Sequence, residues 1–227
     1  MKNLLYKEFR LCMVPMVPLF YLFALMVLIP SYPYLVAGFF TCNALFYVFN
    51  QNAISNDLTY SVMLPVSKKE IVRGRIVFCV IIQMIMFVLF IPMILINQLS
   101  GPAGNPAGVD ASITLLGALL TVFLVFNTSF LPAYYKNPSR LGKHFLRSVI
   151  IVFVWIFLVE GTMGVSQALQ EKVSVFAWIA NRLDCFPKTT EAVVTQLILL
   201  AICALVYGLG MVLIFRRSVK NFELVDL

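Results

Sequence analysis

Long stretches without a single charged side chain dominate this sequence and restrict what it can fold into. Residues 11–56 contain no Asp, Glu, Lys or Arg, and residues 76–109 are again free of charge. Hydrophobic residues make up 61% of the 227-residue chain and charged residues only 12%, whereas a soluble domain carries roughly 25% charged residues. This composition excludes a water-soluble globule and predicts an all-α polytopic membrane protein.

The length of the apolar blocks sets the number of membrane crossings, because a helix needs about 20 apolar residues to cross the hydrocarbon core. Residues 11–56 are long enough for two crossings, and Pro30 and Pro33 mark the turn between them. We predict six transmembrane helices in one transmembrane domain covering residues 1–227, with spans near residues 12–30, 34–52, 76–96, 112–133, 148–165 and 192–214.

The basic residues gather in alternate gaps between these spans. Lys and Arg number three in residues 1–10, four in 50–75, four in 134–147 and three in 216–220. The other gaps contain none, except residues 166–191, where three basic residues are matched by three acidic ones. The positive-inside rule then places both termini in the cytoplasm, as an even number of spans also requires. We expect a multi-pass protein of a bacterial cell (plasma) membrane, in contact with lipid and not with nucleic acid.

One gap, residues 54–75, combines charged side chains with apolar ones. Ser67 and Glu70 have the spacing of a capping box, in which each side chain binds the other residue's backbone amide at a helix start. Pro65 disfavours helix at the residue before it. We predict a short helix, a break at Pro65, and a second helix that begins at Lys68 and continues into the third span.

Two interpretations of this gap remain open at the level of sequence. Leu58, Met63 and Leu64 have no membrane to contact in a cytoplasmic segment, which favours a docking surface for a cytoplasmic partner. The alternative is a polar loop that only connects two spans and carries Lys and Arg for topology.

The first ten residues, MKNLLYKEFR, predict a short interfacial helix before the first span. The leucines and Phe9 can face the membrane, while the basic side chains and Glu8 reach the lipid headgroups of the inner leaflet. An unstructured basic arm is the alternative.

This layout, with the motif LPVSKKEIVRGR after the second span, resembles the ABC-2 type permeases, the membrane subunits of a class of ATP-driven exporters. Within that family the small permeases of peptide-toxin and antimicrobial-peptide exporters, such as the phenol-soluble modulin exporter, look most similar. In the family, the segment between spans two and three resembles a coupling helix that sits in a cleft of the ATPase subunit. The resemblance implies ATPase-coupling roles for Asp57, Leu58, Leu64, Pro65, Val66, Ser67, Lys68, Lys69, Glu70 and Arg73.

The resemblance also implies the partners: two copies of a cytoplasmic ABC ATPase and a second permease chain, in a homodimer or a heterodimer. The chain itself has no phosphate-binding loop, because its Gly142-Lys143 pair has Asn137 where the first glycine should be. We expect no catalytic residue, no metal site and no cofactor on this chain. ATP and Mg would bind to the partner ATPase.

Glu160 is an ionisable residue inside an apolar block and is therefore an intramembrane candidate for function. Its carboxylate could line a path or hydrogen-bond across helices. Equally, it could mark the point where the fifth span ends and a re-entrant segment begins, with Gly161 and Gly164 allowing the break. Residues 166–191 have apolar side chains at helical spacing, which predicts external helices dipping into the outer leaflet before the sixth span.

The nearly charge-free spans favour an amphiphilic substrate, such as a peptide, a toxin or a lipid-like molecule, for an ATP-driven exporter. An ion-coupled secondary transporter is a less favoured alternative, because such proteins usually bury several ionisable groups near the midplane. A non-transporting membrane protein, such as an immunity or scaffold factor, is the other alternative. A requirement for ATP and a partner ATPase would separate the first class from the other two.

Overall fold

The computed structural model describes residues 2–12, 16–100, 105–183 and 189–225, and the regular structure within these ranges is entirely helical. In chain order the helices are α1 (Lys2–Lys7), α2 (Met16–Phe20), α3 (Leu35–Ile54), α4 (Asp57–Met63), α5 (Lys68–Leu99), α6 (Ile113–Lys136), α7 (Leu141–Leu169), α8 (Ser174–Arg182) and α9 (Thr190–Glu223). Wider or tighter turns extend three of them: Glu8–Cys12 is π-helical after α1, and Tyr21–Leu28 and Pro138–Arg140 are 3-10 helical after α2 and before α7. The all-α class is confirmed.

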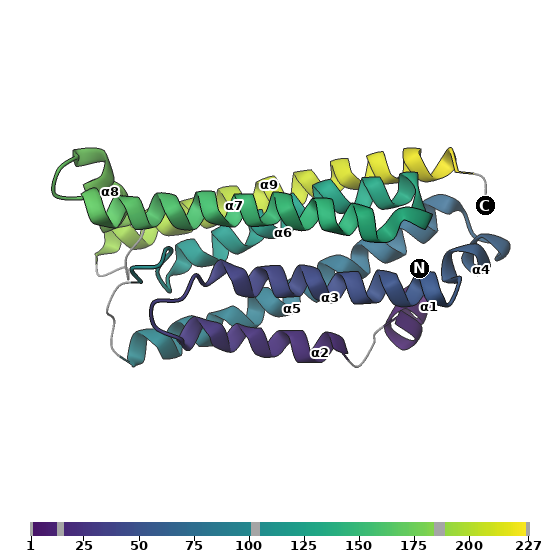
Figure 1. Cartoon of the computed structure of the whole chain (residues 1–227), viewed down its shortest axis with the longest axis horizontal. Helices are drawn as coiled ribbons and strands as arrows, with labels where there is room; N and C mark the ends of the chain where they lie inside the picture. The colour runs from purple at the N-terminus through teal and green to yellow at the C-terminus, as the bar shows by residue number, and fades with distance from the viewer. Residues whose placement is uncertain (1, 13–15, 101–104, 184–188, 226–227) are drawn as a thin grey trace.

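Four helical segments among the described residues are long and apolar enough to cross a membrane. They are Lys68–Leu99, Ile113–Lys136, Pro138–Leu169 and Thr190–Glu223, and the apolar segment Met16–Leu28 is shorter. The helix α3 is less apolar because Asn50, Gln51 and Asn52 occupy its last turns. Even so, α2 and α3 run alongside the long helices (Figure 1). The chain is therefore a polytopic membrane protein, and the count of six spans stays a prediction.

The helix α6 forms the centre of the bundle, with α7 and α9 packed on it and α3 and α5 in contact from the other side. Its buried face is built from large apolar side chains such as Leu119, Phe123 and Phe126. Gly38 lets α3 approach closely, since a Cβ atom at this position would lie 2.6 Å from Cδ1 of Leu119. The core of the protein is thus the space around α6.

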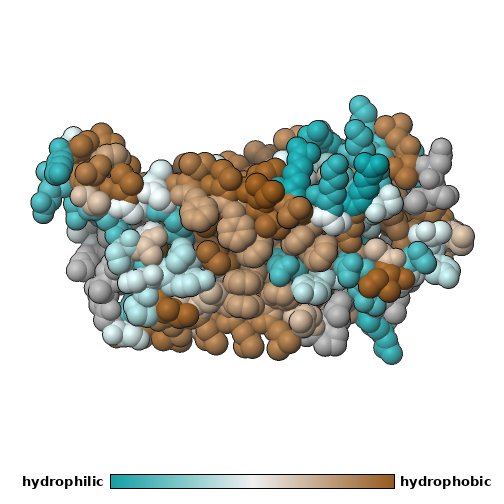
Figure 2. Space-filling view, viewed as in Figure 1, coloured by the Kyte–Doolittle hydropathy of each residue, from teal (hydrophilic) through white to brown (hydrophobic). Residues whose placement is uncertain are grey.

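The two ends of the bundle differ in content. Figure 1 shows α1, α4 and both chain termini at one end, which we call the α4 end, and α8 at the other, which we call the α8 end. Between them lies a broad apolar band, and hydrophilic side chains gather at both ends (Figure 2). This distribution is what a bilayer requires of a protein that spans it.

The structure decides between the two interpretations of the Glu160 region. The helix α7 continues without a break through Gly161 and Gly164 to Leu169, so the alternative in which the span ends near Glu160 is wrong. Within residues 166–191 the structure has one short helix, α8, before α9 begins. Residues 184–188 of this segment lie outside the described residues, and its re-entrant position in the outer leaflet stays a prediction.

Candidate functional site

Charged side chains from distant segments meet inside the protein at the α4 end. Arg75, near the start of α5, and Glu8, in the turn after α1, are both buried. The Nε and Nη2 atoms of Arg75 donate to the two carboxylate oxygens of Glu8 at 3.1 and 2.8 Å. Nη2 also donates to Oδ2 of Asp57, the first residue of α4, at 2.6 Å. This is the two-pronged geometry in which a guanidinium binds carboxylates most strongly.

Lys7 completes this group, which we call the ion cluster (Lys7, Glu8, Asp57 and Arg75). Its Nζ atom donates to both carboxylate oxygens of Asp57 at 2.9 Å and to Oγ of Ser61 at 2.7 Å. Burial alone would raise the pKa of Asp57, but the charges and hydrogen bonds of Arg75 and Lys7 outweigh it and hold that pKa below its ordinary value. The cluster therefore joins α1, α4 and α5 through ionised side chains.

Aromatic rings surround the cluster on its inner side. The guanidinium of Arg75 lies 5.7 Å from the ring centre of Phe49 in α3, a cation–π distance. The ring of Phe49 meets that of Tyr134, in α6, edge to face at 4.7 Å. Tyr134 and Tyr135 are themselves buried. The cluster is thus fixed against α3 and α6 as well as the segments that supply its charges.

The outward side of α4 is apolar and exposed. Tyr60, Met63 and Leu64, which we call the α4 tip, are 65, 76 and 48% exposed, whereas Leu58 on the inward side is buried. The helical spacing of the segment produces this division, because residues 57, 58 and 61 share the face that covers the ion cluster. Exposed apolar side chains gathered in this way are typical of a surface for a protein partner.

The predicted helix, break and second helix are confirmed between α4 and α5. The helix α4 ends at Met63, before Pro65, and α5 runs from Lys68 to Leu99. Ser67 and Glu70 form the capping box: the Glu70 amide donates to Ser67 Oγ at 3.2 Å, and the Ser67 amide donates to Glu70 Oε2 at 3.1 Å. The start of α5 is therefore fixed at its first turn.

The predicted coupling residues fall into three groups by exposure in the structure. Asp57 and Leu58 face inward, and Asp57 is a member of the ion cluster. Val66 and Lys68 are half-buried, with Lys68 Nζ donating to the carbonyl oxygen of Val225 at 2.8 Å. The exposed group consists of Leu64, Pro65, Ser67, Lys69, Glu70 and Arg73. This outer group, with Tyr60 and Met63, is the part of the segment that a partner can reach.

The partners of Asp57 could not be read from the sequence. The expectation that Glu8 reaches the lipid headgroups is wrong, because its side chain is buried and pairs with Arg75, 67 residues away along the chain. A signal was present for Arg75, which lies at helical spacing from the buried Ile71 and Cys79 and so belongs to the inward face of α5. No short-range pattern marks Glu8 as its partner.

Glu160 joins three segments at the α8 end. Its Oε1 atom accepts the amide of Leu35, the first residue of α3, at 2.9 Å, and its Oε2 atom accepts the amide of Val109 at 2.7 Å. The residue is 4% exposed. Gly108 has φ +154°, and a Cβ atom there would overlap the Glu160 carboxylate. Of the alternatives that the sequence left open for Glu160, these contacts show hydrogen bonding to other segments.

The loop that Glu160 holds, residues 105–112, is closed by further polar contacts. The side-chain amide of Asn105 donates to the carbonyl oxygens of Tyr32 at 2.9 Å and Val109 at 3.1 Å. The Asn105 backbone amide donates to the carboxylate of Asp110. Burial raises the pKa of Asp110, and the amide hydrogen bond lowers it by less. The loop is a compact structure packed between the helices at this end.

Polar side chains also meet inside the apolar band. The side-chain amides of Gln83 and Asn127 exchange hydrogen bonds at 3.0 and 2.8 Å, and Tyr207 donates to Oε1 of Gln83 at 2.7 Å. These contacts join α5, α6 and α9, as polar side chains commonly do between membrane helices. The sequence does not mark these residues, because one Gln or Asn in an apolar block looks the same whether or not it has a partner.

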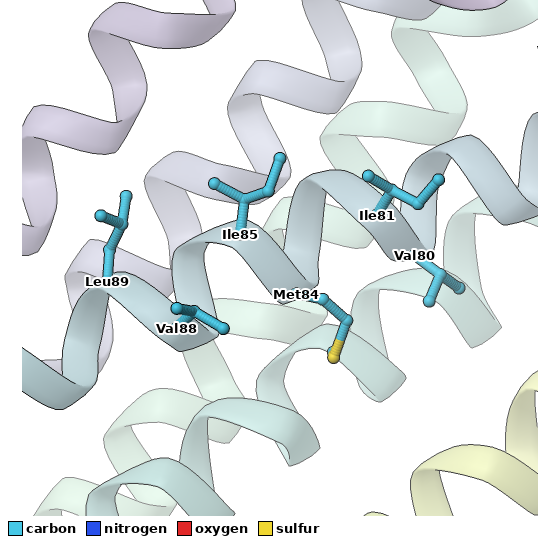
Figure 3. A pocket seen from close by; sticks show the side chains of 6 residues that line it. All are labelled: Val80, Ile81, Met84, Ile85, Val88 and Leu89. Atoms are coloured by element: carbon cyan, nitrogen blue, oxygen red, sulfur yellow. The ribbon is translucent and has the colours of Figure 1, made fainter.

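A shallow groove follows the outer side of α5 within the apolar band. Figure 3 shows its lining, which comes entirely from this helix: Val80, Ile81, Met84, Ile85, Val88 and Leu89. Because none of these side chains can form a strong hydrogen bond, the groove can accept only an apolar chain or an apolar helix face.

Comparison with known protein families gives a match over nearly the whole chain. The family described as "ABC-2 family transporter protein" matches residues 3–223, which is nearly the whole chain. No curated protein and no solved structure matches the chain significantly.

Proposed function

The chain belongs to the ABC-2 transporter family, whose members are the membrane-spanning permeases of ABC transporters, and from this premise we propose that it is the permease subunit of an ATP-driven exporter. The observation that carries the proposal is the α4 tip, an exposed apolar surface mounted directly on the buried ion cluster. An ATPase bound to the tip would touch the one short helix that the cluster ties to α1 and α5.

The contacts of Asp57 support a mechanical role for this arrangement. A displacement of α4 would act on α5 through the Asp57–Arg75 pair and on the N-terminal segment through Lys7 and Glu8. Removing one partner of a buried ion pair costs about 3–5 kcal/mol, so the cluster resists separation and the joined segments move together. In this mechanism the exposed coupling residues contact the ATPase, and Asp57 and Leu58 anchor α4. ATP and Mg bind only to the ATPase.

The distribution of charge supports an orientation. The α4 end carries the basic residues of α7 and α9, the start of α5 and the N-terminal segment, and the positive-inside rule places such an end in the cytoplasm. We expect the segment Met16–Leu28 and the helices α3, α5, α6, α7 and α9 to be six spans of a bacterial plasma membrane. Both termini and the α4 tip would then lie in the cytoplasm, where an ATPase can reach them.

The interior of the apolar band supports an amphiphilic cargo, such as a peptide, a toxin or a lipid-like molecule. The polar side chains of Gln83, Asn127 and Tyr207 hydrogen-bond to one another, and the Glu160 carboxylate accepts backbone amides. Because these polar groups are already paired, mainly apolar side chains are left to contact a cargo. Outward transport rests on the resemblance to exporters. We expect two permease chains, identical or related, to work with two ATPase copies.

Co-purification with an ATP-hydrolysing partner tests this proposal. The tagged chain is extracted from membranes of its native host, and ATP hydrolysis is measured in the eluate. We expect wild type to retain an ATPase and a Met63→Glu/Leu64→Glu variant to lose it, because two carboxylates on the tip prevent apolar contact. The control is Leu224→Glu, which places a charge on an exposed residue at the same end, outside the tip, and should retain the ATPase.

Two results would contradict the proposal. An ATPase retained equally by the Met63→Glu/Leu64→Glu variant and by wild type would mean that the α4 tip is not the docking surface. If no ATPase activity co-purifies with wild type, the exporter would lack an energy source. The immunity or scaffold alternative would then replace the exporter proposal.

A further inference from the structure

Two groups of cations at the α4 end differ in how their charge is balanced. Lys7 and Arg75 are paired with Glu8 and Asp57 in the ion cluster. The other group lies on the ends of α6, α7 and α9 and forms what we call the basic surface: Lys136, Arg140, Lys143, Arg147, Arg216, Arg217 and Lys220. All of these residues are exposed, and among the described residues no carboxylate lies within ion-pair distance of them.

The helices that carry the basic surface pack together. Both α7 and α9 lie against α6. The end of α9 is fixed to that of α6 by the Asn221 side chain, which donates to the carbonyl oxygen of Pro132 at 2.7 Å. Strongly hydrophilic side chains gather at the α4 end beside the brown apolar band in Figure 2. Seven cations therefore share one surface with a single exposed carboxylate from the described residues, Glu223, on the same helix ends.

The basic surface changes to an apolar one within a single helical turn. On α7 the exposed Arg147 is followed three residues later by Ile150, 57% exposed, and on α9 the exposed Arg216 is preceded three residues earlier by Leu213, 64% exposed. Three residues correspond to about 4.5 Å along a helix axis. An abrupt change from cation to exposed aliphatic side chain marks the level where lipid headgroups meet acyl chains.

We propose that the basic surface binds the headgroups of anionic phospholipids in the adjoining leaflet. A phosphodiester placed against these cations balances their charge, and its acyl chains continue along the exposed aliphatic rows of α7 and α9. A protein partner fits this surface less well, because the cations lie beside the lipid-facing apolar rows and not on a projecting element such as the α4 tip. The proposal is independent of ATP-driven transport, because it uses other helices and other side chains.

Native mass spectrometry of the full chain in detergent tests the proposal. The probes are phosphatidylglycerol and phosphatidylcholine with the same acyl chains, and inorganic phosphate is added separately as a competitor. Each Lys or Arg near an anionic lipid surface strengthens binding about fivefold. We therefore expect Arg147→Gln/Arg217→Gln to weaken phosphatidylglycerol binding tenfold or more and to leave phosphatidylcholine binding unchanged. We also expect inorganic phosphate not to compete with phosphatidylglycerol at equal concentration.

The matched control is Lys172→Glu, which lowers the net charge by the same two units at one exposed residue toward the α8 end, outside the basic surface. Binding of phosphatidylglycerol to this variant should stay within about threefold of wild type, since only distant charges change. An equal loss in both variants would mean that net charge alone attracts the lipid, and equal binding of the two lipids by wild type would mean that no anionic site exists. If Arg147→Gln/Arg217→Gln keeps its lipids but loses the co-purifying ATPase, the basic surface is a protein-docking surface instead.

Discussion

Both ends of this protein bind chain segments together through buried carboxylates, but the partners differ. At the α4 end, Glu8 and Asp57 are neutralised by Arg75 and Lys7 from other segments. At the α8 end, Glu160 accepts two backbone amides, one of them at the first turn of α3. One end balances charge with charge, and the other balances charge with the amide dipoles of a helix start and a loop.

This difference in hydrogen-bond partners indicates which end can move and which end is held in place. In the ion cluster every contact joins side chains, so each helix keeps its own backbone hydrogen bonds and could shift with its neighbours as a unit. Glu160 satisfies backbone amides that have no helical partner of their own, so moving it would leave the start of α3 and the 105–112 loop without acceptors. We infer that the α4 end is suited to transmit displacement and the α8 end to hold position.

The largest effect is expected for Arg75→Met. The variant leaves the carboxylates of Glu8 and Asp57 buried with only Lys7 to balance them, and the free energy of unfolding should fall by about 3–5 kcal/mol. A denaturant titration in mixed micelles measures it. The control, Arg73→Met, changes an exposed residue two positions away and should stay within about 0.5 kcal/mol. Similar losses in both variants would contradict the assignment of Arg75 to a buried cluster.

The next effect tests the α8 end. Gly108→Ala places a methyl group where the Glu160 carboxylate lies, which should displace charge-assisted hydrogen bonds and lower the free energy of unfolding by about 2–3 kcal/mol. Gly161→Ala is the matched control, since nothing lies within 4 Å of a Cβ atom there, and in a helix interior it should stabilise by about 0.5–1 kcal/mol. If both glycines respond alike, the contact between the loop and Glu160 does not hold this end.

Lowering the pH should change the stability of the folded protein in opposite directions through Asp57 at the α4 end and Asp110 at the α8 end. The pKa of Asp57 is lowered on folding, so its stabilisation is complete above the ordinary aspartate pKa and is lost as the pH falls through the folded value. The pKa of Asp110 is raised, so protonation relieves a cost of burial. The apparent Tm between pH 6 and 3 should fall less for Asp57→Asn than for wild type, and more for Asp110→Asn. The same slope in both variants would refute this opposition.

The smallest effect is expected in the apolar band between the two ends. It gives a reference with which the losses of stability at the two ends can be compared. Tyr207→Phe removes one hydrogen bond to Gln83 inside the apolar band. Polar contacts between membrane helices are worth about 0.6 kcal/mol on average, so the free energy of unfolding should fall by about that amount. A loss as large as that of Arg75→Met would show that the band, and not the ends, holds the bundle together.

Several elements were predictable because their signals are local. The capping box at Ser67 and Glu70, the break at Pro65 and the long helix that follows all depend on residues within a few positions of one another. The apolar helices α5, α6, α7 and α9 follow from uninterrupted apolar composition. Glu160 could be marked as unusual by the same logic, although the amides that donate to it could not be named.

The contacts that define the candidate site were not predictable in this way. Glu8 and Arg75 are far apart in the sequence, and a single Glu in a basic N-terminal segment has every local reason to face water or headgroups. Gly108 carries no local sign that it lies against Glu160, more than fifty residues later. Pairing across such separations depends on how the helices pack.

The sequence by itself determined that this chain spans a membrane with its basic residues mainly in alternate gaps, because composition and spacing act residue by residue. It also determined the helix, break and helix of the α4 segment. Only the tertiary structure decided which face of α4 is buried, which acids Arg75 binds and which amides Glu160 accepts. Buried charges must find partners across the fold, and the packing of the helices around α6 selects them.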